Sequence, residues 1–293
     1  MPTNPFFRLP HTSSAERLPE LAQFAFDHAG ELCDPAHGCC SYHRGWSMVR
    51  LLLKGGALPA GGAFIGAGLA GAARDGRCRV LLSGSADTGL PALILEVLAA
   101  AGLDADLVIA DRCATPIEQN RRFARHLGRN FELHRAEVQT LHIEPVDAIL
   151  SHSLLNFVPA AVRPALVTTW ARLLRPGGIV LIHQKLVDTP FVQDRSGGLP
   201  AFCARLETAA REFGHDVDAV ARIVQAGSDF WVSHAPESRL SEADLRVLLE
   251  GAGLGIVMIE RMPQRAGLSP KDEAGMSPDT PQSLVIARRP LAA

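Results

Sequence analysis

A glycine-containing turn and a single carboxylate follow two neighbouring apolar runs of this chain. The turn, Gly84-Ser-Ala-Asp-Thr-Gly89, comes directly after the run Val80–Leu82 and opens a helix-like segment over 90–101. The carboxylate, Asp111, ends the run Leu107–Ala110. In a strand–turn–helix–strand unit, N–H groups of the turn approach one part of a nucleotide, and the carboxylate accepts hydrogen bonds from ribose hydroxyls. The sequence therefore predicts a site for a nucleoside cofactor.

The turn by itself does not identify that cofactor. It departs from the Gly-x-Gly-x-x-Gly pattern of dinucleotide-binding enzymes at one position, because Ala86 replaces the second glycine. Asp111 lies 22 residues beyond Gly89, a spacing that also suits an NAD(P)-dependent oxidoreductase. Helices before the first strand, and a last pair of strands joined by a loop, argue against that enzyme class.

From residue 79 the chain alternates apolar runs with helix-like segments, which is typical of a parallel sheet covered on both faces. The expected strands are 79–83, 106–110, 131–135, 146–151 and 178–183, and the expected helices among them are 90–101, 115–127 and 160–174. Two further strands, 255–261 and 282–288, are joined by a loop and preceded by a capped helix over 241–251. If these two strands pair, the last must run antiparallel to its neighbour.

Two helical segments fall outside this alternation. Residues 1–74 contain helix patterns over 20–28, 41–53 and 59–73, and we expect them to form an N-terminal cap or lid. Residues 187–235 contain two more patterns, over 200–213 and 217–226. We expect this insertion to cap a substrate. The predicted domains are 1–74 and 75–293, the second of which carries the insertion.

In this order of elements, residues 75–289 resemble the class I S-adenosylmethionine-dependent methyltransferases. The resemblance rests on the turn after Val80, on Asp111, and on Leu174-Arg-Pro-Gly-Gly178 before the fifth strand. It implies a doubly wound α/β fold with a mostly parallel seven-stranded sheet and an antiparallel last strand. It also implies S-adenosyl-L-methionine as the cofactor and methyl transfer as the reaction.

The resemblance assigns the cofactor contacts along three strand ends. Asp111 matches the acid that binds the ribose hydroxyls, Glu137 stands where the family often has an acid for the adenine amino group, and Ser151–Asn156 follows the strand end that lines the methyl-transfer site. The expected cofactor-binding residues are Gly84, Ser85, Ala86, Asp87, Gly89, Asp111, Arg112, Glu137, Ser151 and His152. Asp87 either binds the amino group of the cofactor or caps the following helix, and capping is the favoured interpretation.

Side chains for the reaction and for the acceptor are expected near the same strand ends. His152, His183 and Tyr42 are the candidate catalytic residues, with His43 and His234 as further candidate bases, although each histidine could simply hydrogen-bond a neighbour. The expected substrate-binding residues are His43, Trp46, Asn156, Phe230 and Trp231. Ordinary core packing is an equally good interpretation of the aromatic ones.

Several acceptors and reactions remain open. The fourth strand does not end in the Asn/Asp-Pro-Pro-aromatic motif of many base-methylating enzymes, so a small molecule methylated at oxygen or nitrogen is the first hypothesis. Attack on the sulfonium by an internal nucleophile, releasing methylthioadenosine in a cyclisation or lyase reaction, is the second. An NAD(P)-dependent oxidoreductase and a non-catalytic binding protein are the remaining alternatives.

Composition and net charge limit the kinds of binding partner and the cellular location that we expect. The net charge is −2 and 47% of the residues are hydrophobic, which argues against nucleic acid and an anionic membrane surface as partners. The first residues do not form a signal peptide pattern, and no run is long enough for a membrane span. We expect a cytoplasmic enzyme with a small-molecule substrate, and a homodimer is compatible with the sequence.

The cysteines do not form a secreted disulfide pattern. Cys33, His37, Cys39, Cys40 and His43 fall close together and are all potential zinc ligands. A structural zinc site usually contains a Cys-x-x-Cys hairpin, whereas here two cysteines are adjacent. We therefore expect reduced, partly buried thiols, and a metal site is the less favoured alternative.

Overall fold

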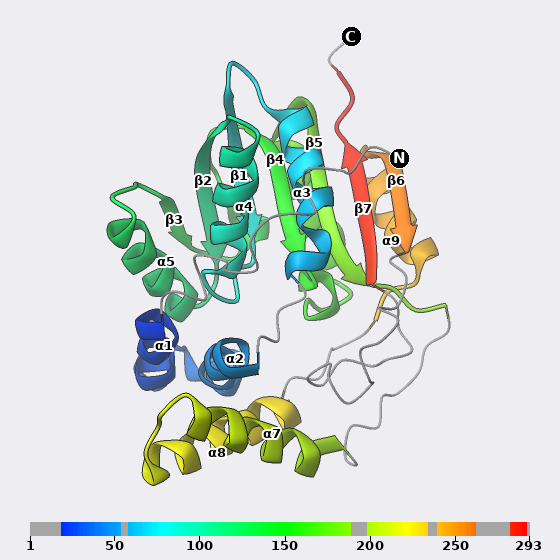
Figure 1. Cartoon of the computed structure of the whole chain (residues 1–293). Helices are drawn as coiled ribbons and strands as arrows, with labels where there is room; N and C mark the ends of the chain where they lie inside the picture. Colours follow the sequence, from blue (N-terminus) through cyan, green and yellow to red (C-terminus); the bar gives the residue numbers. More distant parts are fainter. Residues whose placement is uncertain (1–18, 54–57, 189–197, 234–238, 262–281, 292–293) are drawn as a thin grey trace, which may run out of the picture.

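A seven-stranded sheet in the order β3-β2-β1-β4-β5-β7-β6 lies at the centre of the computed structural model (Figure 1). The structure describes residues 19–53, 58–188, 198–233, 239–261 and 282–291. The strands are β1 (Arg77–Ser83), β2 (Asp104–Asp111), β3 (Glu132–Arg135), β4 (Val146–His152), β5 (Leu174–Lys185), β6 (Gly255–Arg261) and β7 (Gln282–Arg288). β1 to β5 pair in parallel, and β7 runs antiparallel to both neighbours. The predicted sheet is confirmed.

The central strands are apolar on both faces because helices cover both. On one face, α3 (Leu58–Ala72), α4 (Gly89–Ala100) and α5 (Ala114–His126) pack on alternate strand residues such as Leu82 and Leu150. On the other face, α6 (Arg163–Leu173) and α9 (Glu242–Gly251) pack on the intervening residues, such as Leu81 and Ile149. Strand order reverses between β1 and β4, and in such sheets ligands bind at the carboxyl ends of the strands beside this point.

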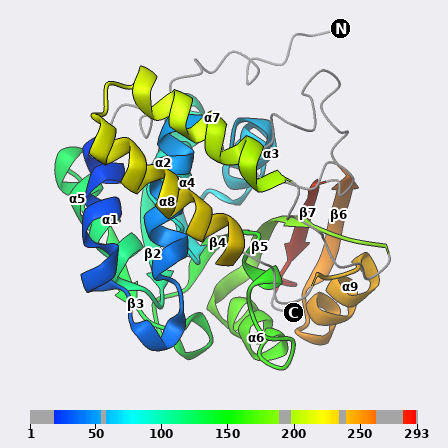
Figure 2. The same cartoon turned by 90° about the horizontal axis from the view of Figure 1, so that it is seen from below.

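A second helical layer stands at these carboxyl ends. It consists of α1 (Pro19–Leu32), α2 (Cys40–Leu53), α7 (Leu199–Glu212) and α8 (Val217–Ser233), which share one apolar core (Figures 1 and 2). We call these four helices the cap. The expected lid and insertion thus meet in one layer, whereas α3, from the same predicted N-terminal segment, packs on the sheet through Ile65 and Leu69. The predicted domain boundary stays a prediction.

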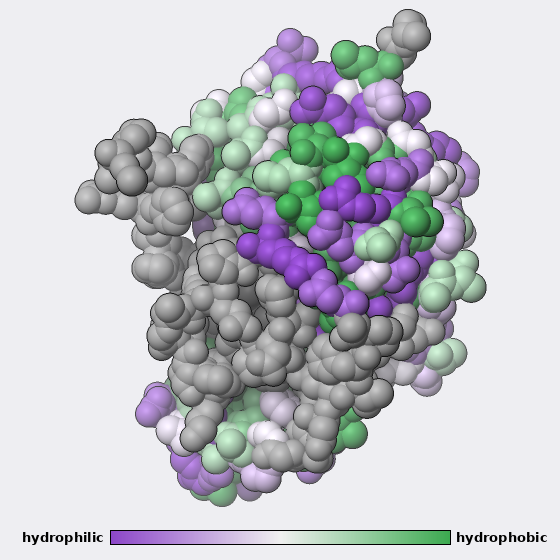
Figure 3. Space-filling model, turned by 90° about the vertical axis from the view of Figure 1, so that its right-hand side faces the viewer, coloured by the Kyte–Doolittle hydropathy of each residue, from purple (hydrophilic) through white to green (hydrophobic). Residues whose placement is uncertain are grey.

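Short 3-10 helices complete the connections, at Pro35–His37 (η2), Val138–Thr140 (η3) and Leu154–Asn156 (η4). The edge strand β6 ends in charged residues, which oppose pairing with another sheet. Arg261 there donates to Asp188 at 3.0 Å. On the face shown in Figure 3, apolar and hydrophilic side chains are interspersed. In the described segments, no helix has the length and hydropathy that crossing a membrane requires.

Gly45 sets the close approach of α2 and α8 within the cap. A Cβ atom at this position would lie 2.4 Å from the carbonyl oxygen of Ala226 and 2.4 Å from Cβ of Phe230. Both atoms belong to the body of α8 rather than to the end of a flexible side chain. Any larger residue must therefore push the two helices apart.

We expect Gly45→Ala to lower the free energy of unfolding by about 1–3 kcal/mol, because the added methyl group overpacks the helix contact. Gly30→Ala is the matched control, since Gly30 lies in α1 and a Cβ atom there would meet no other described atom within 4 Å. It should be neutral or gain up to about 1 kcal/mol from helix propensity. Urea unfolding measures both. Equal stability of the two variants would contradict the observed packing of α2 on α8.

Candidate functional site

The turn after β1 requires a glycine at Gly84, because of its left-handed backbone and its close contact with Leu154. Gly84 has a φ of +78°, and a Cβ atom there would lie 3.0 Å from Cδ1 of Leu154. Its N–H donates to the carbonyl of Ala110 at 2.9 Å. Ala86 does not need a glycine, because the described non-glycine residues with positive φ are Asp75 and Ser153. The missing second glycine is therefore compatible with the turn.

Asp111 joins this turn to the end of β2. Its Oδ2 accepts the N–H of Ser85 at 3.0 Å, and its Oδ1 accepts the N–H of Cys113 at 2.8 Å. Burial raises the pKa of the Asp111 carboxyl, while the charge of His43 and the two N–H groups act against that effect. A carboxylate has further lone pairs beyond these two contacts. Asp111 can thus hold the two loops and accept ligand hydroxyls together.

Asp87 lies at the start of α4 and is shared between two elements. Its Oδ1 accepts the N–H of Gly89 at 2.6 Å. Its Oδ2 accepts from Nε1 of Trp46 at 2.9 Å and forms an ion pair with Arg50, both on α2. The predicted helix-start role is therefore observed. Because the carboxylate has these three partners, it also fixes the cap on the turn.

Aromatic side chains from α2 and α8 meet above the turn. Tyr42 stacks on Trp46 with 6.3 Å between ring centroids, and both rings lie within 6 Å of the Phe230 ring, at 5.8 and 5.9 Å. Burial, followed by the charges of Asp87 and Asp111, raises the pKa of the Tyr42 phenol well above its ordinary value. Tyr42 is therefore a hydrogen-bond donor at neutral pH rather than a base.

The two remaining substrate candidates in the cap lie elsewhere. Trp231 packs against Phe202 inside the α7–α8 pair, with centroids 4.7 Å apart. His43 contacts the Tyr42 ring edge-on, with 5.1 Å between ring centroids, and lies one helical turn after Cys39. Trp231 is thus part of the cap core, and His43 lies at the start of α2. His234 lies outside the described residues.

His152 and His183 face each other on neighbouring strands. They are register partners of β4 and β5, and their rings meet edge to face with 4.5 Å between centroids. Burial lowers the pKa of His152 to about 4, although the charge of Asp87 acts in the opposite direction. Within the described chain, Nε2 of His152 is buried without a hydrogen-bond partner. The site therefore presents a neutral imidazole with an unused nitrogen.

The other predicted residues lie around this centre with different exposure. Ser151 is fully buried next to His152, and its hydroxyl has no partner among the described residues. Asn156 in η4 donates to the carbonyl of Lys185 at 3.4 Å. Arg112 and Glu137 are half-exposed and form an ion pair at 3.7 Å. The latter two are open to solvent at the strand ends, where an adenine ring is expected.

Sequence reasoning missed three residues that hold the turn. Arg50 pairs with Asp87, and Cys113 donates its N–H to Asp111. Asn120 in α5 donates to the carbonyl of Pro116 at 2.8 Å and lies 3.3 Å from the carbonyl of Asp87. The only sequence signal for Asn120 is a polar residue on an otherwise apolar helix face. Arg50 and Cys113 carried no such signal.

Comparisons with known proteins agree with this geometry. Residues 89–178 match a family model described as a methyltransferase domain. A search of curated proteins found no match. Among solved structures, the chain is similar to the 1,6-didemethyltoxoflavin-N1-methyltransferase of Burkholderia thailandensis with bound 1,6-didemethyltoxoflavin and S-adenosylhomocysteine (16% identity, TM-score 0.55, covering 88% of this chain and 92% of that chain).

Two further structures have the same fold. A geranyl diphosphate methyltransferase in complex with GPP and sinefungin is 14% identical with a TM-score of 0.51, and 78% of each chain is covered. A possible exported protein of Bordetella parapertussis is 18% identical with a TM-score of 0.50, and covers 97% of this chain and 99% of that chain. At these identities the similarity shows the fold.

The neutral state of His152 predicts an acid sensitivity of the fold. Its pKa is lowered to about 4 in the folded chain and is about 6.5 when unfolded. Protons therefore favour the unfolded state, and this contribution to stability is present above pH 6.5 and lost as the pH falls towards 4. We expect a loss of about 2 kcal/mol between pH 7 and pH 5 that is absent in His152→Gln. Urea unfolding of both proteins at the two pH values measures it, and parallel losses would contradict the neutral imidazole.

Proposed function

We propose that this chain is a class I S-adenosylmethionine-dependent methyltransferase. It methylates an oxygen or nitrogen atom of a small-molecule acceptor. The observation that carries the proposal is the position of Asp111. Asp111 ends β2 beside Gly84, which has a left-handed backbone conformation, and the cap stands over these carboxyl ends of the strands. Cytoplasmic location and a homodimer remain predictions.

The cofactor half of the proposal uses the turn and the two acids nearby. Asp111 would accept the ribose hydroxyls with the lone pairs that Ser85 and Cys113 leave free. The backbone of the turn from Gly84 to Gly89 would lie against the methionine part of the cofactor. Glu137 and Arg112, half-exposed at the next strand end, would border the adenine. S-Adenosylmethionine, when bound, supplies an activated methyl group on a sulfonium.

The acceptor half uses the cap. The rings of Tyr42, Trp46 and Phe230 pack together in the cap, and His152 and His183 contact each other at the carboxyl ends of β4 and β5. An acceptor bound between these two groups would be shielded from water, which favours displacement at a sulfonium because alignment and a dry site contribute most of the catalysis. We propose a small molecule as the acceptor for such a site.

The protonation states favour a particular kind of acceptor. His152 is neutral at pH 7, so it does not repel a sulfonium, and its free Nε2 can accept a hydrogen bond from the acceptor. With a pKa of about 4 it is a weak general base. Tyr42 is held protonated by its burial and by the two nearby acids. We therefore propose an acceptor that is already nucleophilic, such as a neutral amine, a ring nitrogen or an acidic hydroxyl.

Loss of the Asp111 carboxylate should weaken cofactor binding. We expect Asp111→Ala to weaken the binding of S-adenosylmethionine and S-adenosylhomocysteine by about 1.5–3 kcal/mol, because charged hydrogen bonds to the ribose are lost. Titration calorimetry measures this change. Asp104→Ala is the matched control, because Asp104 begins the same strand at its opposite end.

The control should bind both ligands with unchanged affinity. Asp111→Asn, which keeps the shape of the side chain, should lie between the wild type and Asp111→Ala. Circular dichroism verifies that each variant is folded. An Asp111→Ala affinity equal to that of the wild type would place the ribose elsewhere, and nicotinamide cofactor binding in place of either ligand would overturn the proposal.

Product analysis distinguishes the reaction types. Incubation with S-adenosylmethionine and a panel of amines, nitrogen heterocycles and phenols should yield S-adenosylhomocysteine and a methylated acceptor, as detected by mass spectrometry. Methylthioadenosine as the nucleoside product would instead support the intramolecular reaction. Tight cofactor binding without any product would support a binding protein with this fold.

A further inference from the structure

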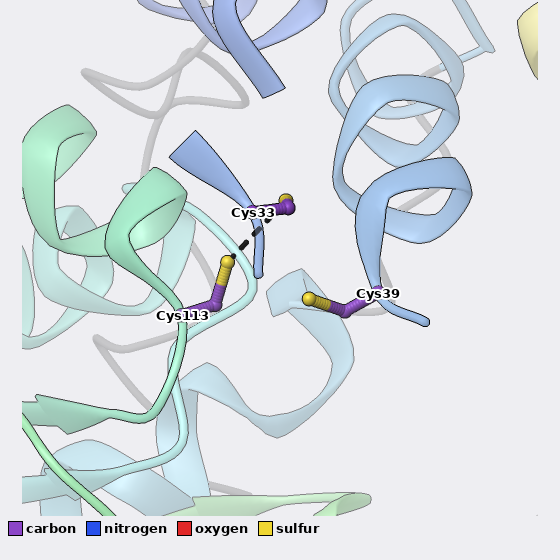
Figure 4. Close-up of side chains that lie close together, drawn as sticks. All are labelled: Cys33, Cys39 and Cys113. Atoms are coloured by element: carbon purple, nitrogen blue, oxygen red, sulfur yellow. Dashed lines mark hydrogen bonds between the residues drawn. The ribbon is translucent and has the colours of Figure 1, made fainter. Parts of the chain in front are cut away.

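Three cysteine thiols converge beside the proposed ribose acid, on a part of the chain that the methyl-transfer chemistry does not use. The sulfur atoms of Cys33, Cys39 and Cys113 all lie within 4.8 Å of one another. Sγ of Cys33 is 3.4 Å from Sγ of Cys113 and 3.1 Å from Oγ1 of Thr115. Figure 4 shows the three side chains gathered around one space. Cys33 and Cys113 are buried and Cys39 is partly buried.

These separations match the ligand sphere of a thiophilic cation. Zinc binds thiolate sulfur at about 2.3 Å in a tetrahedron, so two sulfur ligands of one zinc lie about 3.8 Å apart. The observed distances bracket that value. A small inward movement of Cys39 would bring all three sulfur atoms to bonding distance of a common centre.

His43 offers the fourth ligand. It lies one helical turn after Cys39, so both side chains project from the same side of α2. It is buried, and its Nδ1 has no hydrogen-bond partner in the described part of the chain. The ring lies outside the group of ligand atoms that are all within 4.8 Å of one another, so it would have to move inward to bind the same ion. A set of three cysteines and one histidine is a frequent composition of structural zinc sites.

We propose that Cys33, Cys39, Cys113 and His43 form a structural site for one thiophilic divalent cation, with zinc as the best match. The ligands come from the end of α1, the start of α2 and the residue that precedes α5. The cation therefore joins the cap to the loop after β2, where Cys113 donates its N–H to Asp111. Cys40, His37 and His43, which the sequence placed with the candidates, lie outside the group of ligand atoms within 4.8 Å of one another, and Cys113 joins Cys33 and Cys39 in it.

Metal titration of the reduced full chain tests the site. After treatment with a chelator and a reductant, we expect the protein to take up one equivalent of Co²⁺. It should then show the thiolate charge-transfer and intense ligand-field absorption of a tetrahedral sulfur-rich site, and Zn²⁺ should displace the cobalt. Zn²⁺ should also raise Tm by about 4 °C or more.

Matched cysteine variants separate ligation from general effects on folding. Cys113→Ser and Cys39→Ser should each lose charge-transfer intensity and bind Co²⁺ at least about 10-fold more weakly. Cys40→Ser, next to a ligand, and Cys203→Ser, on α7, should bind it like the wild type. Cobalt uptake that is the same in Cys113→Ser as in the wild type would overturn the proposal. So would a Cys33–Cys113 disulfide in the isolated protein together with no metal uptake after reduction.

Discussion

The position of the cap depends on one buried carboxylate. Asp87 accepts the first N–H of α4, the indole N–H of Trp46 and the guanidinium of Arg50. A buried carboxylate without such partners would be strongly destabilising, so the arrangement is stable only while α2 lies on the turn. Because Gly45 brings α8 into direct contact with α2, the same carboxylate also places α8 and its aromatic residues. The geometry of the candidate site therefore depends on the contacts of Asp87 with Trp46 and Arg50 of the cap.

Burial also determines the charge state of the candidate site at the ends of β4 and β5. The Nε2 atom of His152 is buried at the carboxyl end of β4, and burial lowers the pKa of the ring, so the imidazole remains neutral at pH 7. A cationic ring there would repel a bound sulfonium, whereas a neutral ring can hydrogen-bond an acceptor. Burial at these strand ends thus sets the charge state of the candidate site.

Much of this was predictable from local sequence patterns. The strands appear as apolar runs because helices bury them on both sides, and Asp111 was identifiable because it ends one such run. A methyltransferase domain was likewise predicted from strand order and the Leu174–Gly178 segment, and residues 89–178 match a family model of that description. The contacts of the turn were not predictable, because Trp46 is separated from Asp87 by 41 positions and no periodicity links them. Cys113 was missed for the same reason, since its partners Cys33 and Cys39 lie on the cap.

Two groups of contacts, an ion pair and a cysteine cluster, hold the cap beside Asp111. The Asp87–Arg50 ion pair fixes α2 along its middle, and the cysteine cluster lies at the α1–α2 junction, against the loop after β2. An ion pair alone would allow α2 to pivot about Arg50. The cysteine cluster adds a second contact at Cys39, which lies at the start of α2. Two contacts along α2 fix the direction of its axis. Since Cys113 also donates to Asp111, any movement of the cap at the cluster must be transmitted to the residue proposed to bind the ribose. A movement of α2 would also involve α8, because α8 packs on α2 at the carbonyl oxygen of Ala226 and at the Phe230 ring.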